Sequence, residues 1–201
     1  RVAGQSKCNL RNRLVAPLID CFAYRWMKKR YINYQIGENN IESLGIDLNQ
    51  TMVLRAQEHG FKAIQADALN YLSEQKSGSV SAITGFHIVE HIPFGTLLRM
   101  FQECYRVLKP GGIMIFETPN PESIHVGSFS FYFDPSHLHP IPPEILAFAA
   151  ENRGFEKVEI LRLHPKRDDY DTYPGIKDER LHEVASRFFG PQDYAIIAKK
   201  D

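Results

Sequence analysis

The stretch that decides the fold is residues 106–121, which reads RVLKPGGIMIFETPNP. The segment before it predicts a helix, because Pro93 suits a first turn and apolar side chains then recur at helical spacing. The apolar face of this helix would consist of Leu97, Phe101, Cys104, Tyr105 and Leu108. The Lys-Pro-Gly-Gly turn at 109–112 would end the helix, and 113–117 is apolar enough for a buried strand. A helix followed by a tight turn and a buried strand is the repeating unit of an α/β fold.

The same alternation of strands and helices continues on both sides of this stretch. Further strands are expected at 41–47, 61–66, 80–86, 155–163 and 194–198. Further helices are expected at 49–59, 143–154 and 178–189. Strands that alternate with helices predict a Rossmann-like, mostly parallel sheet with helices on both faces. The last two strands predict an antiparallel hairpin at the edge of this sheet, wrapped around a helix.

The composition is that of an ordinary globular protein. The chain has 201 residues, 43% of them hydrophobic and 24% charged, which indicates one domain or one domain with a helical extension. No apolar run reaches the ~18 residues of a membrane span. The three widely spaced cysteines fit neither a disulfide framework nor a zinc motif, so we expect buried thiols in a cytoplasmic protein.

Residues 1–35 differ in charge from the rest of the chain. They hold eight basic side chains and one acidic side chain, whereas 36–201 hold sixteen basic and twenty-three acidic ones. Leu14, Leu18, Phe22 and Trp26 would form one apolar stripe, so we expect a basic helical arm on a domain that spans 36–201. The arm would pack on the domain, or would dock on a protein partner or on a membrane surface from the cytoplasmic side. We expect no nucleic-acid partner, because the body is acidic and carries no nucleic-acid motif.

Two carboxylates stand at strand ends. Asp47 follows the first expected strand and Asp67 the second. In open α/β sheets, ligands bind beyond the carboxyl ends of the strands. Asp47 could accept hydrogen bonds from ribose hydroxyls and Asp67 one from an adenine amino group, with Leu48 and Ala68 beside a flat base. The alternative is that both carboxylates cap helices or lie in solvated loops.

Histidines gather after the strand at 80–86 and on a later loop. The first group is His87-Ile-Val-Glu90-His91, and the loop contains DPSHLHP at 134–140, with His137 and His139. Histidine titrates near neutral pH and suits a general base that takes the proton of an acceptor. His-x-x-Glu-His with a distant histidine could also bind a divalent metal, and a purely structural role is the third alternative. We assign no metal site from the sequence.

The loop at 127–140 is rich in aromatic residues, namely Phe129, Phe131, Tyr132 and Phe133. Exposed rings there could stack on a sugar face. The alternative is that they fix the loop onto the core.

Five motifs stand in an order that resembles class I S-adenosylmethionine-dependent methyltransferases. They are GIDLN at 45–49, QADAL at 65–69, FHIVEHIP at 86–93, RVLKPGG at 106–112 and FETPNP at 116–121. Three later segments are similar to methyltransferase domains of bacterial surface-polysaccharide (O-antigen) biosynthesis. These are FYFDPSHLHPIPPEILAF at 131–148, GFEKVEILRLHP at 154–165 and FGPQDYAIIAKK at 189–200. The resemblance covers about 36–200.

The resemblance implies S-adenosylmethionine as cofactor. It places Asp47 on the ribose and Asp67 on the adenine, with Phe86 and His87 beside the methionine part. The expected reaction is O-methylation of a sugar or phosphosugar, with Glu90, His91 and His137 as the catalytic group. The alternatives are a quinone-type small-molecule acceptor and an inactive scaffold or glycan-binding module. A nicotinamide oxidoreductase is disfavoured, because the chain contains no Gly-x-Gly-x-x-Gly.

One element of the family is not found in this sequence. The family begins with a strand and a glycine-rich turn that lets the backbone approach the methionine carboxylate. Here only YQIGENN at 34–40 precedes the strand at 41–47, and its single glycine, Gly37, follows no strand. We expect that about twenty to thirty residues are absent between Tyr34 and Gly37, because the first strand is central in this fold.

Overall fold

The computed structural model describes residues 42–166 and 178–201. The chain divides into two units, 1–43 and 44–201, and the strands and helices named below belong to the second. The predicted arm at 1–35 and its docking role, like Cys8 and Cys21, lie outside the described residues.

The strands form two sheets. In the smaller sheet, β1 (Gly45–Asp47) pairs in parallel with β2 (Ala63–Gln65). The larger sheet has the order β3-β4-β6-β5. Its strands are β3 (Val80–Phe86), β4 (Leu108–Pro119), β5 (Glu156–Pro165) and β6 (Pro191–Lys199). The β3–β4 pair is parallel, whereas β6 runs antiparallel to both β4 and β5, which confirms the predicted C-terminal hairpin.

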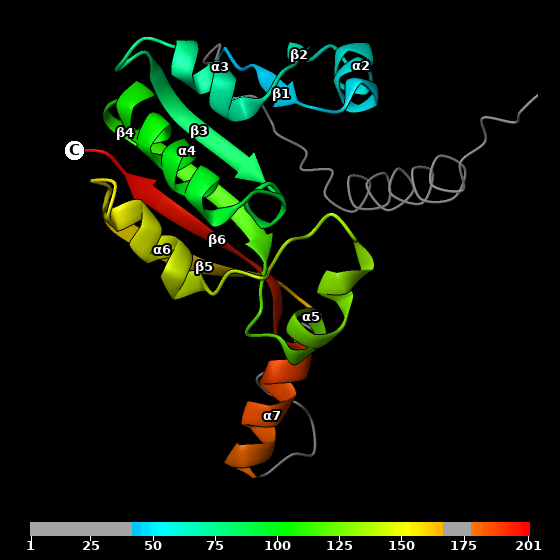
Figure 1. Cartoon of the computed structure of the whole chain (residues 1–201). Helices are drawn as coiled ribbons and strands as arrows, with labels where there is room; N and C mark the ends of the chain where they lie inside the picture. The colour runs from blue at the N-terminus through cyan, green and yellow to red at the C-terminus, as the bar shows by residue number, and fades with distance from the viewer. Residues whose placement is uncertain (1–41, 167–177) are drawn as a thin grey trace, which may run out of the picture. The chain divides into compact units, whose positions relative to one another are not determined.

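The helices connect these strands. They are α2 (Gln50–Glu58), α3 (Ala68–Glu74), α4 (Phe94–Val107), α5 (Ile124–Ser128), α6 (Pro143–Glu151) and α7 (Glu179–Phe189), with 3-10 turns η2 (Val89–His91) and η3 (Ser130–Phe133). Figure 1 shows α4 and α6 on one face of the larger sheet, with α5 and α7 beyond its end. Among the described residues, no helix is long and apolar enough to cross a membrane.

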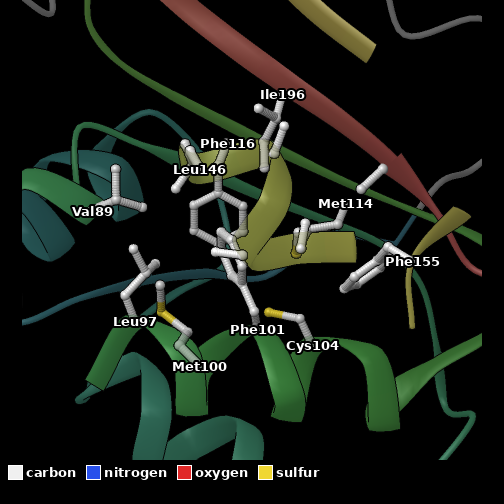
Figure 2. Packing of buried hydrophobic residues seen from close by; sticks show 14 of the residues in the cluster. Val89, Leu97, Met100, Phe101, Cys104, Met114, Phe116, Leu146, Phe155 and Ile196 are labelled. Atoms are coloured by element: carbon white, nitrogen blue, oxygen red, sulfur yellow. The ribbon is translucent and has the colours of Figure 1, made fainter. Parts of the chain in front are cut away.

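The core lies between the larger sheet and the helices α4 and α6. Figure 2 shows Phe101 of α4 facing Phe116 of β4, and the centroids of these two rings are 5.2 Å apart. Of the predicted apolar face of α4, Leu97, Phe101 and Cys104 are fully buried and Tyr105 is partly buried. Leu108 is fully buried too, but it is the first residue of β4 and not part of the helix. Burial raises the pKa of the Cys104 thiol to about 12, which agrees with an inert core thiol.

Several element boundaries differ from the sequence prediction. Strand β4 begins at Leu108, so the Lys-Pro-Gly-Gly turn belongs to the strand. The reason is that Gly111 N donates to Lys200 O at 2.7 Å and Lys200 N to Gly112 O at 3.0 Å, which ties the turn to the chain end. Helix α3 was not predicted, because it has seven residues and buries only Leu72, which leaves little apolar periodicity to detect.

Candidate active site

A tight turn after β3 carries the first group of ionisable side chains. His87 has a φ of 51°, a left-handed conformation that is strained in a residue with a side chain. The turn η2 then buries Glu90 completely. Glu90 Oε2 accepts a hydrogen bond from Thr118 Oγ1 at 2.9 Å, and Glu90 Oε1 lies 3.0 Å from His87 Nδ1. Burial opposes ionisation of Glu90, but the pairing with His87 brings its pKa below the ordinary value.

The loop at 134–140 lies against this turn. Leu138 N donates to Glu90 O at 2.9 Å, and the Ser136 hydroxyl lies 3.0 Å from His91 Nδ1. The rings of His91 and His137 pack edge to face, with 4.6 Å between their centroids. The structure therefore brings Glu90, His91 and His137 together. Two distant segments of the sequence contribute them, since 45 residues separate His91 from Ser136.

The hydrogen bonds determine which ring nitrogen of each histidine carries the proton. His137 Nδ1 lies 2.6 Å from Phe131 O, and a carbonyl oxygen can only accept, so Nδ1 is the protonated nitrogen. The single Ser136 hydroxyl proton goes to Asp134 Oδ1 at 2.5 Å, so Ser136 accepts from His91 Nδ1. In the neutral rings, Nε2 then carries the lone pair on both histidines. Both can accept a proton or coordinate a cation through Nε2.

The local environment favours the neutral form of His137. Burial lowers its pKa below the ordinary 6.5, and the hydrogen bond to Phe131 O opposes this shift only in part. Burial disfavours ionisation of Asp134 as well, but the hydrogen bonds from Ser136 hold its pKa below the ordinary 3.8. The geometry therefore combines a neutral imidazole with a nearby ionised carboxylate at neutral pH.

A small pocket opens beside these histidines. Its lining includes His137, His125 and Phe131 from the loop side, and Pro119, Gln192 and Asp193 from the ends of β4 and β6. The pocket has a volume of about 240 Å³, which suits the reacting part of an acceptor rather than a drug-sized molecule of ~300–1,000 Å³.

A second group of ionisable side chains surrounds His87. Its Nε2 lies 3.6 Å from both Glu117 Oε1 and Asp193 Oδ1. His164 Nε2 lies 3.6 Å from the same Glu117 oxygen. Glu117 and Asp193 were not predicted as site residues. The available signal was a carboxylate beside an apolar run, in IMIFE at 113–117 and in DYAII at 193–197, because buried acids are rare unless they have a role.

The residues predicted to hold the cofactor lie on the smaller sheet and at the end of β3. Asp47 ends β1, and its Oδ1 accepts from Asn49 N at 2.7 Å. Asp67 caps α3 through a hydrogen bond from Asn70 N to Oδ1 at 2.8 Å. The helix-capping alternative is thus realised for Asp67, and a capping carboxylate can still accept further hydrogen bonds through its second oxygen.

The side chains expected beside the base and the methionine differ in exposure. Leu48 and Phe86 are exposed, at 69% and 39%, whereas Ala68 is half-buried. Exposed apolar side chains near strand ends are available to a flat ligand. The assignment of these side chains to a cofactor stays a prediction.

The aromatic residues of the loop at 127–140 do not all have the same role: one packs on the core and the others are exposed. Phe131 is buried and its ring packs on His137, with 4.5 Å between centroids, so it fixes the loop onto the core. Phe129, Tyr132 and Phe133 are more than half exposed, and in the chain they flank Ser130 and Phe131, which line the pocket.

Comparisons with known proteins agree with this architecture. Residues 29–116 match the family described as "Methyltransferase domain". The chain is similar to an S-adenosylmethionine-dependent methyltransferase of known structure from Archaeoglobus fulgidus, with 32% identity and a TM-score of 0.71. That similarity covers 80% of this chain and 76% of the other, and it confirms the predicted Rossmann-like methyltransferase fold.

Curated relatives include enzymes named ubiquinone biosynthesis O-methyltransferase. The one from Methylococcus capsulatus is 30% identical over 42% of this chain and 37% of its own length. The one from Xanthomonas oryzae pv. oryzae is 34% identical over 37% of this chain and 33% of its own length. The chain thus spans about a third of the length of these relatives. From its fold and its similarity to the Archaeoglobus fulgidus protein, the chain belongs to the S-adenosylmethionine-dependent methyltransferase family, whose cofactor is S-adenosylmethionine.

Proposed function

We propose that the protein transfers the methyl group of S-adenosylmethionine to an oxygen of a small-molecule acceptor. The observation that carries the proposal is the pair His91 and His137, each with Nε2 as the lone-pair nitrogen, beside the pocket at the end of the larger sheet. The acceptor oxygen attacks the methyl carbon in line with the sulfonium. A C–O bond forms, the C–S bond breaks, and sulfur keeps the electron pair. The hydroxyl proton moves to Nε2 of a histidine.

Within this group, His137 is the base and His91 is the second candidate. His137 lines the pocket, and its lowered pKa keeps it neutral near pH 7. Glu90 is fully buried and contacts Thr118 and His87, so we assign it a positioning role instead of the direct role expected from the sequence.

The acceptor class rests on chemistry and on the relatives. The curated relatives reported above are named for ubiquinone biosynthesis, so the acceptor that we favour is a phenolic hydroxyl of a quinone precursor. The sugar or phosphosugar of a surface glycan, expected from the sequence, comes second. The exposed rings Phe129, Tyr132 and Phe133 can stack on either acceptor, and the two are separated by direct assay of each.

The cofactor would lie across the carboxyl ends of β1 and β3. Asp47 would accept hydrogen bonds from the ribose and Asp67 one from the adenine, with Leu48 and Ala68 beside the base. Phe86 and His87 would border the methionine part. Support comes from the position of Asp47 at the end of β1 and from the exposure of Leu48 and Phe86.

The proposal includes a strand and a glycine-rich turn between Tyr34 and Gly37. Within the described residues, β1 is hydrogen-bonded to β2 and β3 to β4, and no described strand joins the two sheets. One strand between β1 and β3 would complete a continuous sheet. The turn after that strand would supply backbone N–H groups for the methionine carboxylate.

Calorimetry of S-adenosylmethionine binding to the full chain tests the cofactor assignment. Asp47→Ala removes charge-assisted hydrogen bonds worth roughly 1.5–3 kcal/mol, so affinity should fall about ten- to a hundredfold. The matched control is Glu58→Ala, an exposed carboxylate on α2, which should leave affinity unchanged. Equal affinities for both variants contradict the assignment. Tight binding without methyl transfer to either acceptor class would favour the inactive-scaffold alternative.

A further inference from the structure

The group around His87 is built by three neighbouring strands. His87 directly follows β3, Glu117 lies in β4 and Asp193 lies in β6, and these strands are adjacent in the order β3-β4-β6. The register pairs Phe86 with Glu117 and Pro119 with Asp193, so the three side chains converge at one end of the sheet. Donors fixed by a sheet are held more rigidly than donors on a loop, which suits a preorganised site.

The distances in this group match metal coordination better than direct hydrogen bonds. His87 Nε2 is 3.6 Å from one oxygen of each carboxylate, beyond the usual 2.7–3.2 Å of an N–H···O bond. Two ligand atoms that each lie about 2.1 Å from one ion are roughly 3.4–3.6 Å apart at tetrahedral or trigonal angles. The donor atoms of His87, Glu117 and Asp193 all lie within 4.8 Å of one another, so one ion can contact all three.

The other nitrogen of His87 lies close to a carboxylate, as the second nitrogen of a metal-bound imidazole commonly does. Its Nδ1 lies 3.0 Å from Oε1 of Glu90, which is fully buried. Metal-ligating histidines usually donate this second N–H to a carboxylate, which orients the ring and directs the lone pair of Nε2 at the metal. The left-handed φ of 51° at His87 is a second local sign, since strain of this kind clusters at functional sites.

We infer that His87 Nε2, Glu117 and Asp193 bind a first-row divalent cation such as Mn²⁺ or Zn²⁺. One imidazole and two carboxylates are ligands that both ions accept. His164 Nε2, 3.6 Å from the same Glu117 oxygen and half exposed, is placed to become a fourth ligand from the solvent side. Glu117 and Asp193 are 6% and 9% exposed, so the ion would be largely shielded from water.

The neighbouring group of Glu90, His91 and His137 also offers three donor atoms within 4.8 Å. It is the weaker candidate, because its donors stand on the turn η2 and on the loop at 134–140, whereas Glu117 and Asp193 lie in strands of the larger sheet. The two groups meet at the pocket, which Asp193 and His137 both line. If the proposed function holds, an ion at His87 would polarise the acceptor oxygen while His137 takes its proton.

Titration of the full chain with Mn²⁺, followed by electron paramagnetic resonance, tests the inference without cofactor or acceptor. We expect one bound Mn²⁺ that shows coupling to ¹⁵N in protein labelled at histidine, and displacement of Mn²⁺ by Zn²⁺. The ligand variants Glu117→Gln and Asp193→Asn keep the side-chain size, and each should weaken Mn²⁺ binding by roughly 10–100-fold or more. The variant Glu90→Gln, which acts through His87, should weaken Mn²⁺ binding by roughly 10–100-fold.

Matched controls separate this site from its neighbour. His137→Gln and Glu122→Gln, a carboxylate that pairs with Arg162, should leave Mn²⁺ affinity unchanged. Circular dichroism verifies that each variant is folded. Absence of ¹⁵N coupling, equal binding by the Glu117 and Asp193 variants, or loss of binding in His137→Gln overturns the inference. If the protein binds Mn²⁺ but transfers no methyl group, only the proposed function is contradicted. If it transfers a methyl group but binds no Mn²⁺, only the metal site is contradicted.

Discussion

At the scale of single residues, the candidate site depends on histidines and buried carboxylates that the fold brings to one end of the larger sheet. His87, His91 and His137 were identified because histidines after a strand and on a later loop are a recognisable pattern. Glu117 and Asp193 were not identified, because a single acid in a strand forms no motif with neighbouring residues in the sequence. Only the strand order β3-β4-β6 places these two carboxylates beside His87. The roles of all these residues stay predictions.

Ser136 is expected to orient His91, because its hydroxyl accepts from His91 Nδ1 and donates to Asp134. Ser136→Ala removes this orientation, and a hydrogen bond of about 0.5–1.5 kcal/mol corresponds to a two- to tenfold fall in kcat. The matched control is Ser128→Ala on α5, whose hydroxyl bonds only a local carbonyl, Ile124 O, in the recorded contacts. Steady-state kinetics separates kcat from KM, and an equal kcat in both variants would remove Ser136 from the mechanism.

The pKa of His137 predicts the acid limb of the pH–rate profile. A general base must be neutral, and burial lowers the pKa of His137 below 6.5. Activity is therefore retained as pH falls to 6.5 and is lost only as pH falls through the lowered pKa. The kcat/KM profile of the free enzyme should show an acid limb with its midpoint below pH 6.5. A midpoint above 6.5, or the same limb in His137→Ala, would show that another group titrates.

At the scale of secondary structure elements, the sequence predicted those with strong periodicity or clear caps. The range of β3 agrees in full, and α2 begins after Asn49 and α7 after Asp178, as predicted. The short elements α3 and α5 were missed. Their stability comes from tertiary contacts, such as the Arg106 guanidinium of α4 that donates to Leu72 O at the end of α3, at 2.9 Å.

Gly85 tests the packing of β3 on β4. A Cβ at Gly85 would overlap the ring of Phe116, which is 2% exposed and held against Phe101. Gly85→Ala should destabilise the protein by about 1–3 kcal/mol, the usual cost of overpacking. The matched control is Gly95→Ala at the start of α4, where an added Cβ meets nothing within 4 Å. Thermal denaturation should show a lower Tm for Gly85→Ala alone, and equal Tm values would mean that β3 shifts freely on β4.

The break between the two sheets predicts a difference in the peptide map. Trypsin cleaves after Arg30 and Arg55, so the sequence as printed yields one peptide of residues 31–55. If a strand and a glycine-rich turn lie between Tyr34 and Gly37, the protein lacks this peptide and yields longer or additional ones. Mass spectrometry of a tryptic digest decides the question, and detection of the intact 31–55 peptide would contradict the proposed segment.

At the scale of the whole molecule, the order of the motifs indicates the family and the fold. The proposed chemistry depends on the position of the loop at 134–140. The order of motifs indicated the methyltransferase fold, which the 32% identical structure confirms. The position of the loop against η2 brings His137 to His91 and forms the pocket lined by His137 and Asp193. The acceptor class depends on exposed side chains, which the fold constrains least.

The central claim is that the histidine pair serves transfer of a methyl group from S-adenosylmethionine to oxygen. The most direct measurement uses mass spectrometry to follow a deuterated methyl group from the cofactor to a phenolic quinone precursor. It compares the unaltered protein with His137→Ala and with the control His59→Ala. His59 is exposed at the end of α2. The account predicts a labelled methyl ether, turnover lowered about 10²–10⁴-fold in His137→Ala only, and cofactor affinity unchanged in all three. A label on an atom other than oxygen, or full turnover by His137→Ala, would contradict it.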